Sequence, residues 1–178
     1  MKITLDSARQ FARSILAAQG VPADIADDVA EHLVEADRSG YVSHGLSILP
    51  NYRRAIESGN VNPTGRAACV LDRDMLMVFD GNGGFGQHVG KTVMTRAIER
   101  VRQHGHCIVT LRKSHHLGRM GHYGEMVASA GFVLLSFTYV INRPPVVAPF
   151  GGRVPRLTTN PLCFAGPMPN GRPPLVVD

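Results

Sequence analysis

Histidine and glycine are crowded into one short stretch of this chain, Ser114–Glu125, whose sequence is SHHLGRMGHYGE. The stretch follows the apolar run Cys107–Leu111, which is typical of a buried strand, and precedes a helical pattern that reaches about Gly131. A strand, a glycine-containing turn and a helix in this order predict a site at the edge of a sheet, where functional residues are often found. The chain is therefore limited to folds that combine helices with a sheet.

The side chains of this stretch suit proton transfer beside an anion. A histidine has an unperturbed pKa of about 6.5, so it can take and return a proton near neutral pH. Arg119 is cationic, and the neighbouring glycines expose backbone N–H groups that bind phosphate or carboxylate. We expect a proton-transferring histidine here, close to a bound phosphate or carboxylate.

Composition narrows the class of protein. The 178 residues are 44% hydrophobic and 19% charged, which indicates a soluble globular protein with one core or two small lobes. No apolar run approaches the ~20 residues that cross a bilayer, so no membrane partner is expected. The net charge of +5 comes from scattered basic residues without interleaved aromatic side chains, which argues against nucleic-acid binding. Scattered charge is equally compatible with anionic small molecules.

The cysteines predict a reducing compartment. Cys69, Cys107 and Cys163 are odd in number and far apart, and two of them lie inside apolar runs. This pattern favours buried free thiols over a disulfide framework or a zinc site. We therefore expect a cytoplasmic protein.

Helical and strand patterns alternate along the chain, which predicts an α/β or α+β fold. An N-cap at Asp6 or Ser7 is expected to start the first helix, and a hairpin is expected before the glycine-rich segment 81–87. From Ile141 onward the chain looks irregular until a terminal strand. We expect helices at 6–20, 22–40, 46–56, 89–104 and before 131, and strands at 67–71, 75–79, 107–111, 132–140 and 174–178.

Gly81–Gly86 formally matches the dinucleotide fingerprint G-x-G-x-x-G. However, the preceding strand is predicted to be the second of a hairpin and not the first of a βαβ unit. No acidic residue follows the next strand to hold a ribose, and Arg112 is a weak substitute that would need a 2′-phosphate. A glycine-rich turn that lets a helix start tightly is the favoured interpretation.

Other polar groups have both structural and functional interpretations. Ser43 precedes a helical pattern, so it is a natural N-cap, and His44 taken alone is more consistent with a structural role. The histidines of Ser114–Glu125, together with Glu125, suit a metal site, which leaves a metal-dependent hydrolase as an alternative. No H-E-x-x-H motif accompanies them, so this metal hypothesis is weak. Thr158–Pro161 alone is an ordinary turn.

Taken together, these segments resemble the type 2 malate/L-lactate dehydrogenase family of NAD(P)-dependent 2-hydroxyacid dehydrogenases, whose fold is not Rossmann. The sequence looks most similar to the hydroxycarboxylate dehydrogenase B branch, with an apolar residue at Ile48 and a proline at Pro50. The matching segments follow the family's order and cover nearly the whole chain: Ser43–Tyr52, Asp80–Gln87, Ser114–Glu125, Val147–Gly152, Thr159–Pro167 and Pro174–Asp178.

The resemblance implies a truncated version of that non-Rossmann fold, with N-terminal helices and a mixed sheet with flanking helices. Residues 1–62 would form a helical segment that contributes Ser43 and His44 to the site. Residues 63–178 would form an α/β cofactor and catalytic domain, incomplete at its C-terminus. The family is homodimeric, so a homodimer acting on a small 2-hydroxy or 2-oxo acid is expected. Because family members continue past Asp178, the chain is expected to be a fragment or a natural truncation.

The resemblance also implies roles for individual residues. His116 matches the acid/base histidine, which exchanges the hydroxyl proton while a hydride passes between C2 and NAD or NADP. His44 and Ser43 match pocket residues with a catalytic role. The implied contacts are Gly118, Arg119, Met120, Val176, Val177, Asp178 and His44 with the cofactor, and Ser43, Tyr52, Asn160 and Pro161 with the substrate.

Two residues depart from the family pattern. Ile48 stands where many members have an arginine suited to a substrate carboxylate, so the substrate class stays open. Thr158 stands where a glycine is usual, which is expected to distort its loop. Because much of the family's length is missing, a catalytically incompetent remnant is an alternative to an active dehydrogenase.

Overall fold

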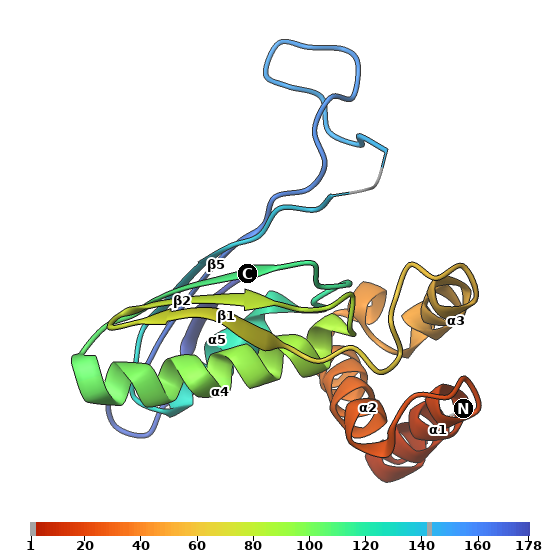
Figure 1. Ribbon diagram of the computed structural model, residues 1–178, viewed down its shortest axis with the longest axis horizontal. Coiled ribbons are helices and arrows are strands. Elements are labelled where there is room, and N and C mark those ends of the chain that lie inside the picture. The colour runs from red at the N-terminus through yellow and green to blue at the C-terminus, as the bar shows by residue number, and fades with distance from the viewer. Residues whose placement is uncertain (1–2, 142–143) are drawn as a thin grey trace. The chain divides into compact units, whose positions relative to one another are not determined.

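The structure is a computed structural model that describes residues 3–141 and 144–178 (Figure 1). The chain divides into two compact units, Met1–Tyr123 and Gly124–Asp178, called here the N-terminal and the C-terminal unit. Both combine helices with strands, so the predicted α/β or α+β class is confirmed.

The N-terminal unit starts with helices and continues into a sheet. Its elements are α1 (Leu5–Ala17), α2 (Ala23–Arg38), the 3₁₀ helices η1 (Val42–His44) and η2 (Leu46–Ile48), α3 (Leu49–Glu57), β1 (Ala68–Arg73), β2 (Leu76–Asp80), α4 (Gly86–His104) and β3 (Ile108–Arg112). Helix α1 is capped by Thr4, whose hydroxyl oxygen accepts a hydrogen bond from the Ser7 backbone N–H, so the predicted cap at Asp6 or Ser7 is wrong.

The first three helices share one hydrophobic core. Ile25, Val29 and Leu33 recur at helical spacing on α2 and are fully buried, together with Leu16 of α1 and Tyr52 of α3. Tyr52 is thus part of the core, although its hydroxyl group is polar. This core holds the segment between α2 and α3, which carries Ser43 and His44.

The link between α2 and α3 differs from the prediction. Ser43 does not cap a helix but lies inside η1. The carboxylate of Asp37 accepts a hydrogen bond of 2.9 Å from the Leu46 backbone N–H. A Cβ at Gly45 would lie 1.9 Å from Asp37 Oδ1, so glycine lets the chain pass closely over this carboxylate. The 3₁₀ helix η2 therefore replaces the first turn of the helix predicted at 46–56, and η1 lies before that range.

The sheet of the N-terminal unit is mixed, as predicted. Strand β2 pairs with β1 in antiparallel fashion and with β3 in parallel fashion, and α4 connects β2 to β3. The same strand is therefore the second of a hairpin and the first of a βαβ unit, so the second of these roles was wrongly excluded. Met77 and Phe79 of β2 pack against Val93 and Ala97 of α4.

Glycines in the turn before α4 allow close backbone contacts. A Cβ at Gly84 would lie 2.3 Å from the carbonyl oxygen of Gly65, and one at Gly86 would lie 2.3 Å from that of His116. Such approaches exclude any larger side chain. The turn thus packs the start of α4 against the histidine stretch, in line with the tight glycine-rich turn favoured from the sequence.

The C-terminal unit contains an antiparallel sheet in the order β4–β5–β6. Helix α5 (Met120–Ser129) begins in the N-terminal unit and continues into this one, where it is followed by β4 (Leu134–Phe137), β5 (Leu162–Gly166) and β6 (Leu175–Val177). Strand β5 contradicts the prediction of an irregular chain after Ile141. Its backbone hydrogen bonds are supplied by β4, which lies more distant in sequence, and by β6, which follows after a short connection.

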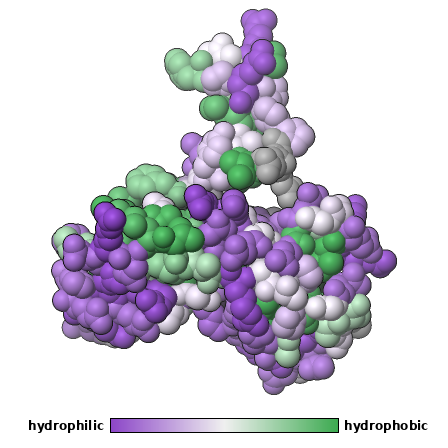
Figure 2. Space-filling model, viewed as in Figure 1, coloured by the Kyte–Doolittle hydropathy of each residue, from purple (hydrophilic) through white to green (hydrophobic). Residues whose placement is uncertain are grey.

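One face of this sheet exposes hydrophobic side chains. The alternating residues Leu135 and Phe137 of β4 are 57% and 74% exposed, and Leu162 and Val177 on the neighbouring strands are exposed as well. Figure 2 shows hydrophobic residues at the surface in green. On the opposite face, a Cβ at Gly124 would lie 2.8 Å from the Ala165 Cβ, so α5 packs closely there.

The cysteines only partly match the prediction. Cys163 is buried and Cys107 is half-buried, but Cys69 is exposed on β1, and all three are free thiols. The expectation of a buried thiol at Cys69 is wrong because β1 has a mostly exposed side-chain pattern. Within the described ranges, no helix is long and apolar enough to cross a membrane.

Candidate active site

The half-buried imidazole of His116 is the centre of the candidate site. Its Nδ1 lies 2.9 Å from the Tyr52 hydroxyl oxygen, within hydrogen-bond distance. The stretch that carries His116 is held against the turn before α4, where the His115 backbone N–H donates to the Gly84 carbonyl oxygen at 3.0 Å. Nδ1 of His116 therefore faces a side chain of the helical core.

His44 stacks on His116. The centroids of the two rings are 5.3 Å apart and their planes are inclined by 27°. The exposed Ser43 hydroxyl lies 2.9 Å from Nδ1 of His44. The structure therefore brings Ser43, His44 and His116 together, although the two histidines are far apart in the sequence.

A second buried residue supports Tyr52. Tyr52 and Gln87 are each 1% exposed, and the Gln87 amide Nε2 donates a hydrogen bond to the Tyr52 hydroxyl oxygen. Three side chains from α3, α4 and the histidine stretch thus form a chain of hydrogen bonds, Gln87–Tyr52–His116. The sequence assigned no role to Gln87, although its place just after the glycine turn was a usable signal.

The predicted cofactor-contacting turn is buried in this structure. Gly118 has φ +77°, and a Cβ there would lie 2.4 Å from Nε2 of His32, so only glycine fits. The Arg119 backbone N–H donates to the same nitrogen at 2.9 Å, and the guanidinium lies 4.9 Å from the centre of the Tyr41 ring. Met120 is buried as well. The predicted cofactor contacts of these residues remain a prediction.

His32 is a buried histidine that sequence analysis missed. It is 2% exposed, and its ring centre lies 4.4 Å from that of His122. Burial, followed by the charge of His122, lowers the pKa of His32 to about 2. The neutral ring accepts from the Arg119 N–H through Nε2, so its hydrogen is carried by Nδ1. His32 therefore fixes the turn after His116 and takes no part in proton exchange near neutral pH.

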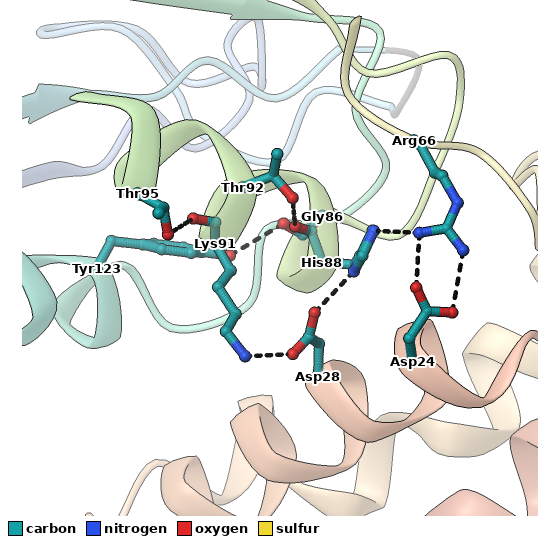
Figure 3. Close-up of polar contacts among 9 residues, drawn as sticks. All are labelled: Asp24, Asp28, Arg66, Gly86, His88, Lys91, Thr92, Thr95 and Tyr123. Carbon is teal, nitrogen blue, oxygen red and sulfur yellow. Dashed lines mark hydrogen bonds and ion pairs between the residues drawn. The ribbon is translucent and has the colours of Figure 1, made fainter. Parts of the chain in front are cut away.

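A network of charged side chains joins α2 to α4 (Figure 3). The Asp28 carboxylate accepts hydrogen bonds from His88 Nδ1, at 2.7 Å, and from Lys91. Arg66 pairs with Asp24 through both terminal nitrogens and also donates to Nε2 of His88. Because His88 directly follows Gln87, this network fixes the first turn of α4 and with it the position of Gln87.

The remaining predicted site residues lie in the C-terminal unit. Asn160 and Pro161 are exposed just before β5. Val177 and Asp178 are exposed and Val176 is half-buried at β6. Their predicted contacts with substrate and cofactor remain a prediction.

The two departures from the family pattern have structural consequences. Ile48 packs as a partly buried side chain against the helical core. Thr158 is buried, and its hydroxyl donates to the Val140 carbonyl oxygen at 2.6 Å. An isoleucine at position 48 offers no cation to a carboxylate, while threonine at 158 makes a specific contact of its own.

The histidines do not form an evident metal site. Among residues 3–141 and 144–178, no three His, Cys, Asp or Glu side chains are grouped so that they could hold a metal ion. His122 instead packs on His32 and Tyr123 through ring contacts.

The chain is similar in sequence to known dehydrogenases. The chain is 84% identical over all 178 residues to an L-lactate dehydrogenase of Cupriavidus necator and covers 51% of that protein. It is 36% identical over 166 residues to hydroxycarboxylate dehydrogenase B of Escherichia coli, covering 93% of this chain and 46% of the relative. The chain thus spans about half the length of the curated relatives it matches.

Solved structures show the same fold. The sulfolactate dehydrogenase of Methanocaldococcus jannaschii superposes with a TM-score of 0.92 at 31% identity, covering all of this chain and 50% of that one. The malate dehydrogenase of Pyrococcus horikoshii gives a TM-score of 0.90 at 34% identity, with the same coverage. The sequence pattern of the malate/L-lactate dehydrogenase family matches residues 3–178, and the chain belongs to this family.

Proposed function

We propose that this chain carries the acid/base histidine of an NAD(P)-dependent 2-hydroxyacid dehydrogenase. The observation that carries the proposal is the stacking of His44 on His116, whose Nδ1 faces Tyr52. The other ring nitrogen, Nε2, is proposed to face the substrate. In oxidation, Nε2 of His116 accepts the hydroxyl proton while the C2–H electron pair leaves as hydride. In reduction, the imidazolium returns this proton to the carbonyl oxygen.

The cofactor is proposed to be NAD or NADP, which supplies the nicotinamide that accepts the hydride when it is bound. The exposed carboxylate of Asp178 has the chemistry to hold a ribose hydroxyl. Arg119 fits a phosphate less well, because its guanidinium is buried over Tyr41 and its backbone N–H is bound to His32. We therefore assign the cofactor contacts of this chain chiefly to Val177 and Asp178.

The substrate is proposed to be L-lactate, with pyruvate in the reverse direction. The support is the 84% identity to the Cupriavidus necator L-lactate dehydrogenase. Apolar Ile48 suits a substrate with a small methyl group better than one with a second carboxylate. Ser43, Asn160 and Pro161 are proposed substrate contacts, and residues 1–62 are proposed to supply Ser43 and His44.

A chimera tests this function. In the Cupriavidus necator enzyme, the 178 matched residues are replaced by this chain, and L-lactate-dependent reduction of NAD⁺ or NADP⁺ is followed by absorbance. We expect turnover, and we expect His116→Ala to lower kcat about 10²- to 10⁴-fold with NADH binding retained. His106→Ala, which removes an exposed histidine before β3, is the matched control. Equal turnover of the His116→Ala and His106→Ala proteins would remove His116 from the role.

The second candidate is that these 178 residues by themselves bind no cofactor and catalyse no reaction, because they span about half the length of the curated relatives. Fluorescence titration of the 178-residue chain with NADH and NADPH separates the two. Saturable binding supports a functional cofactor site within these residues, whereas a flat response with both cofactors would show that the 178 residues do not form one alone.

We also propose that the protein is a cytoplasmic homodimer. The exposed apolar side chains of β4 and β6 support an apolar interface, and the free thiols support a reducing compartment. Light scattering coupled to size exclusion measures the oligomeric state. Introduction of a charge by Phe137→Glu should shift a dimer to monomer, and a mass independent of this change would contradict the proposed interface.

A further inference from the structure

The hydrogen-bonded chain behind His116 ends at a buried amide that the proposed reaction does not use. Gln87 and Tyr52 are each 1% exposed, so neither side chain is placed to meet solvent. The Gln87 Nε2 donates to the Tyr52 oxygen, which lies 2.9 Å from Nδ1 of His116. Oε1 of Gln87 is buried and has no hydrogen-bond partner among the described residues. A buried amide that is left half-satisfied carries an energetic cost, which calls for a compensating role.

The direction in which the hydrogen bonds of the Gln87–Tyr52–His116 series run decides which nitrogen of His116 carries a hydrogen. If Gln87 donates to Tyr52, the single hydroxyl hydrogen of Tyr52 points to Nδ1, and the neutral ring must carry its hydrogen on Nε2. A half-turn of the amide presents Oε1 instead, because its two ends have nearly the same shape. Tyr52 then donates to Oε1 and accepts from Nδ1–H, which leaves the lone pair on Nε2.

Only the second direction suits a base at Nε2. When Nε2 takes the substrate proton, Nδ1–H still donates to Tyr52 and Tyr52 still donates to Gln87. No hydrogen bond behind the ring has to change between the neutral and the cationic forms. In the first direction, protonation would force the Tyr52 hydroxyl to turn, which costs reorganisation during the reaction.

We propose that the Gln87 amide is turned relative to the placement above, so that Oε1 accepts from the Tyr52 hydroxyl. Acting through Tyr52, Gln87 is then a positioning residue that holds His116 in the Nδ1–H tautomer, with Nε2 directed to the substrate. The inference rests on the proposed role of His116 as acid/base. Gln87 touches neither substrate nor cofactor in this scheme, and Tyr52 is a positioning residue as well. The charged network between Asp28 and His88 holds the turn that carries Gln87.

Nitrogen-15 NMR of the 178-residue chain tests the tautomer without turnover or cofactor. At a pH where the ring is neutral, long-range ¹H–¹⁵N correlations of His116 should show a protonated Nδ1 and a bare Nε2. Gln87→Met removes the acceptor at similar length and should raise the share of the Nε2–H form about fivefold, the size expected for one hydrogen bond. Gln87→Glu keeps an acceptor oxygen and should preserve the Nδ1–H form.

Further variants distinguish positioning from general support. Tyr52→Phe should shift the tautomer ratio of His116 in the same direction as Gln87→Met. The variant that combines both substitutions should have the same ratio as Tyr52→Phe alone, because Gln87 acts through the Tyr52 hydroxyl. Tyr123→Phe is the matched control, since the buried Tyr123 hydroxyl faces the Gly86 and Leu117 carbonyl oxygens and not His116.

Two outcomes would overturn the inference while leaving the proposed function open. One is an Nε2–H tautomer of His116 in the wild-type chain, and the other is an unchanged tautomer ratio in Gln87→Met. If Tyr52→Phe does not fold, the two Gln87 variants still decide the question. Loss of turnover in His116→Ala together with either outcome would retain the acid/base role and reject the positioning role.

Discussion

The Tyr52 hydroxyl lies 2.9 Å from Nδ1 of His116, although Tyr52 belongs to a helix of the N-terminal core and His116 to the turn before α5. This contact gives Tyr52 a protein partner inside the fold. Tyr52 therefore has two candidate roles, which are direct binding of the substrate and positioning of the His116 ring.

Tyr52→Phe in the chimera should lower kcat for L-lactate about 10- to 100-fold and leave KM nearly unchanged, because the ring of His116 loses its orienting partner. Steady-state kinetics with varied L-lactate measures the two constants separately. A raised KM with unchanged kcat would show that Tyr52 binds substrate directly, as the resemblance implied.

Gly86→Ala should lower the free energy of unfolding by about 2 kcal/mol or more, because the added Cβ would lie 2.3 Å from the His116 carbonyl oxygen, which is part of the backbone. Urea unfolding followed by circular dichroism measures the loss. Gly166→Ala is the control, since its Cβ would meet only Val133 Cγ2 at 3.5 Å. Equal stability of the two variants would contradict the tight packing of this turn.

His32 should make stability fall in mild acid. Its folded-state pKa of about 2 lies below the ordinary value, so below about pH 6.5 the unfolded chain binds a proton that the folded chain does not. The stabilising contribution is therefore present above this pH and is lost as pH falls, by about 1 kcal/mol per unit. His32→Gln, which keeps an acceptor for the Arg119 N–H, should flatten urea-derived stability between about pH 5 and 6.5. An unchanged slope would exclude His32 as its source, and exposed His104→Gln is the control.

Asp28→Asn should weaken the link between α2 and α4 (Figure 3). Burial raises the pKa of Asp28, but the hydrogen bonds from His88 and Lys91 outweigh burial and lower it overall. The contribution of Asp28 is present above the ordinary aspartate pKa and is lost as pH falls through the lowered one. At neutral pH we expect the variant to lose about 1 kcal/mol in urea unfolding. Asp27→Asn, which removes an exposed ion pair between α2 and Arg13 of α1, is the control. A similar loss there would show that the network between α2 and α4 contributes no more than an exposed ion pair.

Local patterns in the sequence predicted most of the elements. Helical spacing placed α2 and α4, and two short strand-like runs joined by a polar turn placed the hairpin. The histidine stretch was correctly expected between a strand and a helix. These features depend on neighbours within a few residues, so they can be recognised without the fold. The cap at Thr4 was missed because several capping residues are adjacent, and only backbone geometry selects one of them.

Contacts between distant segments lay beyond the sequence. Strand β5 forms because β4 and β6 supply its backbone hydrogen bonds. Strand β2 pairs with β1 in antiparallel and with β3 in parallel fashion. Likewise, the resemblance of collinear motifs predicted that His44 and His116 share a site. The amino-acid order could not show that Tyr52 contacts Nδ1 of His116 and that Gln87 contacts Tyr52. The chemical groups of the site were determined by sequence alone. Their orientation was decided by tertiary packing, because a hydrogen bond requires distances that only the folded core enforces.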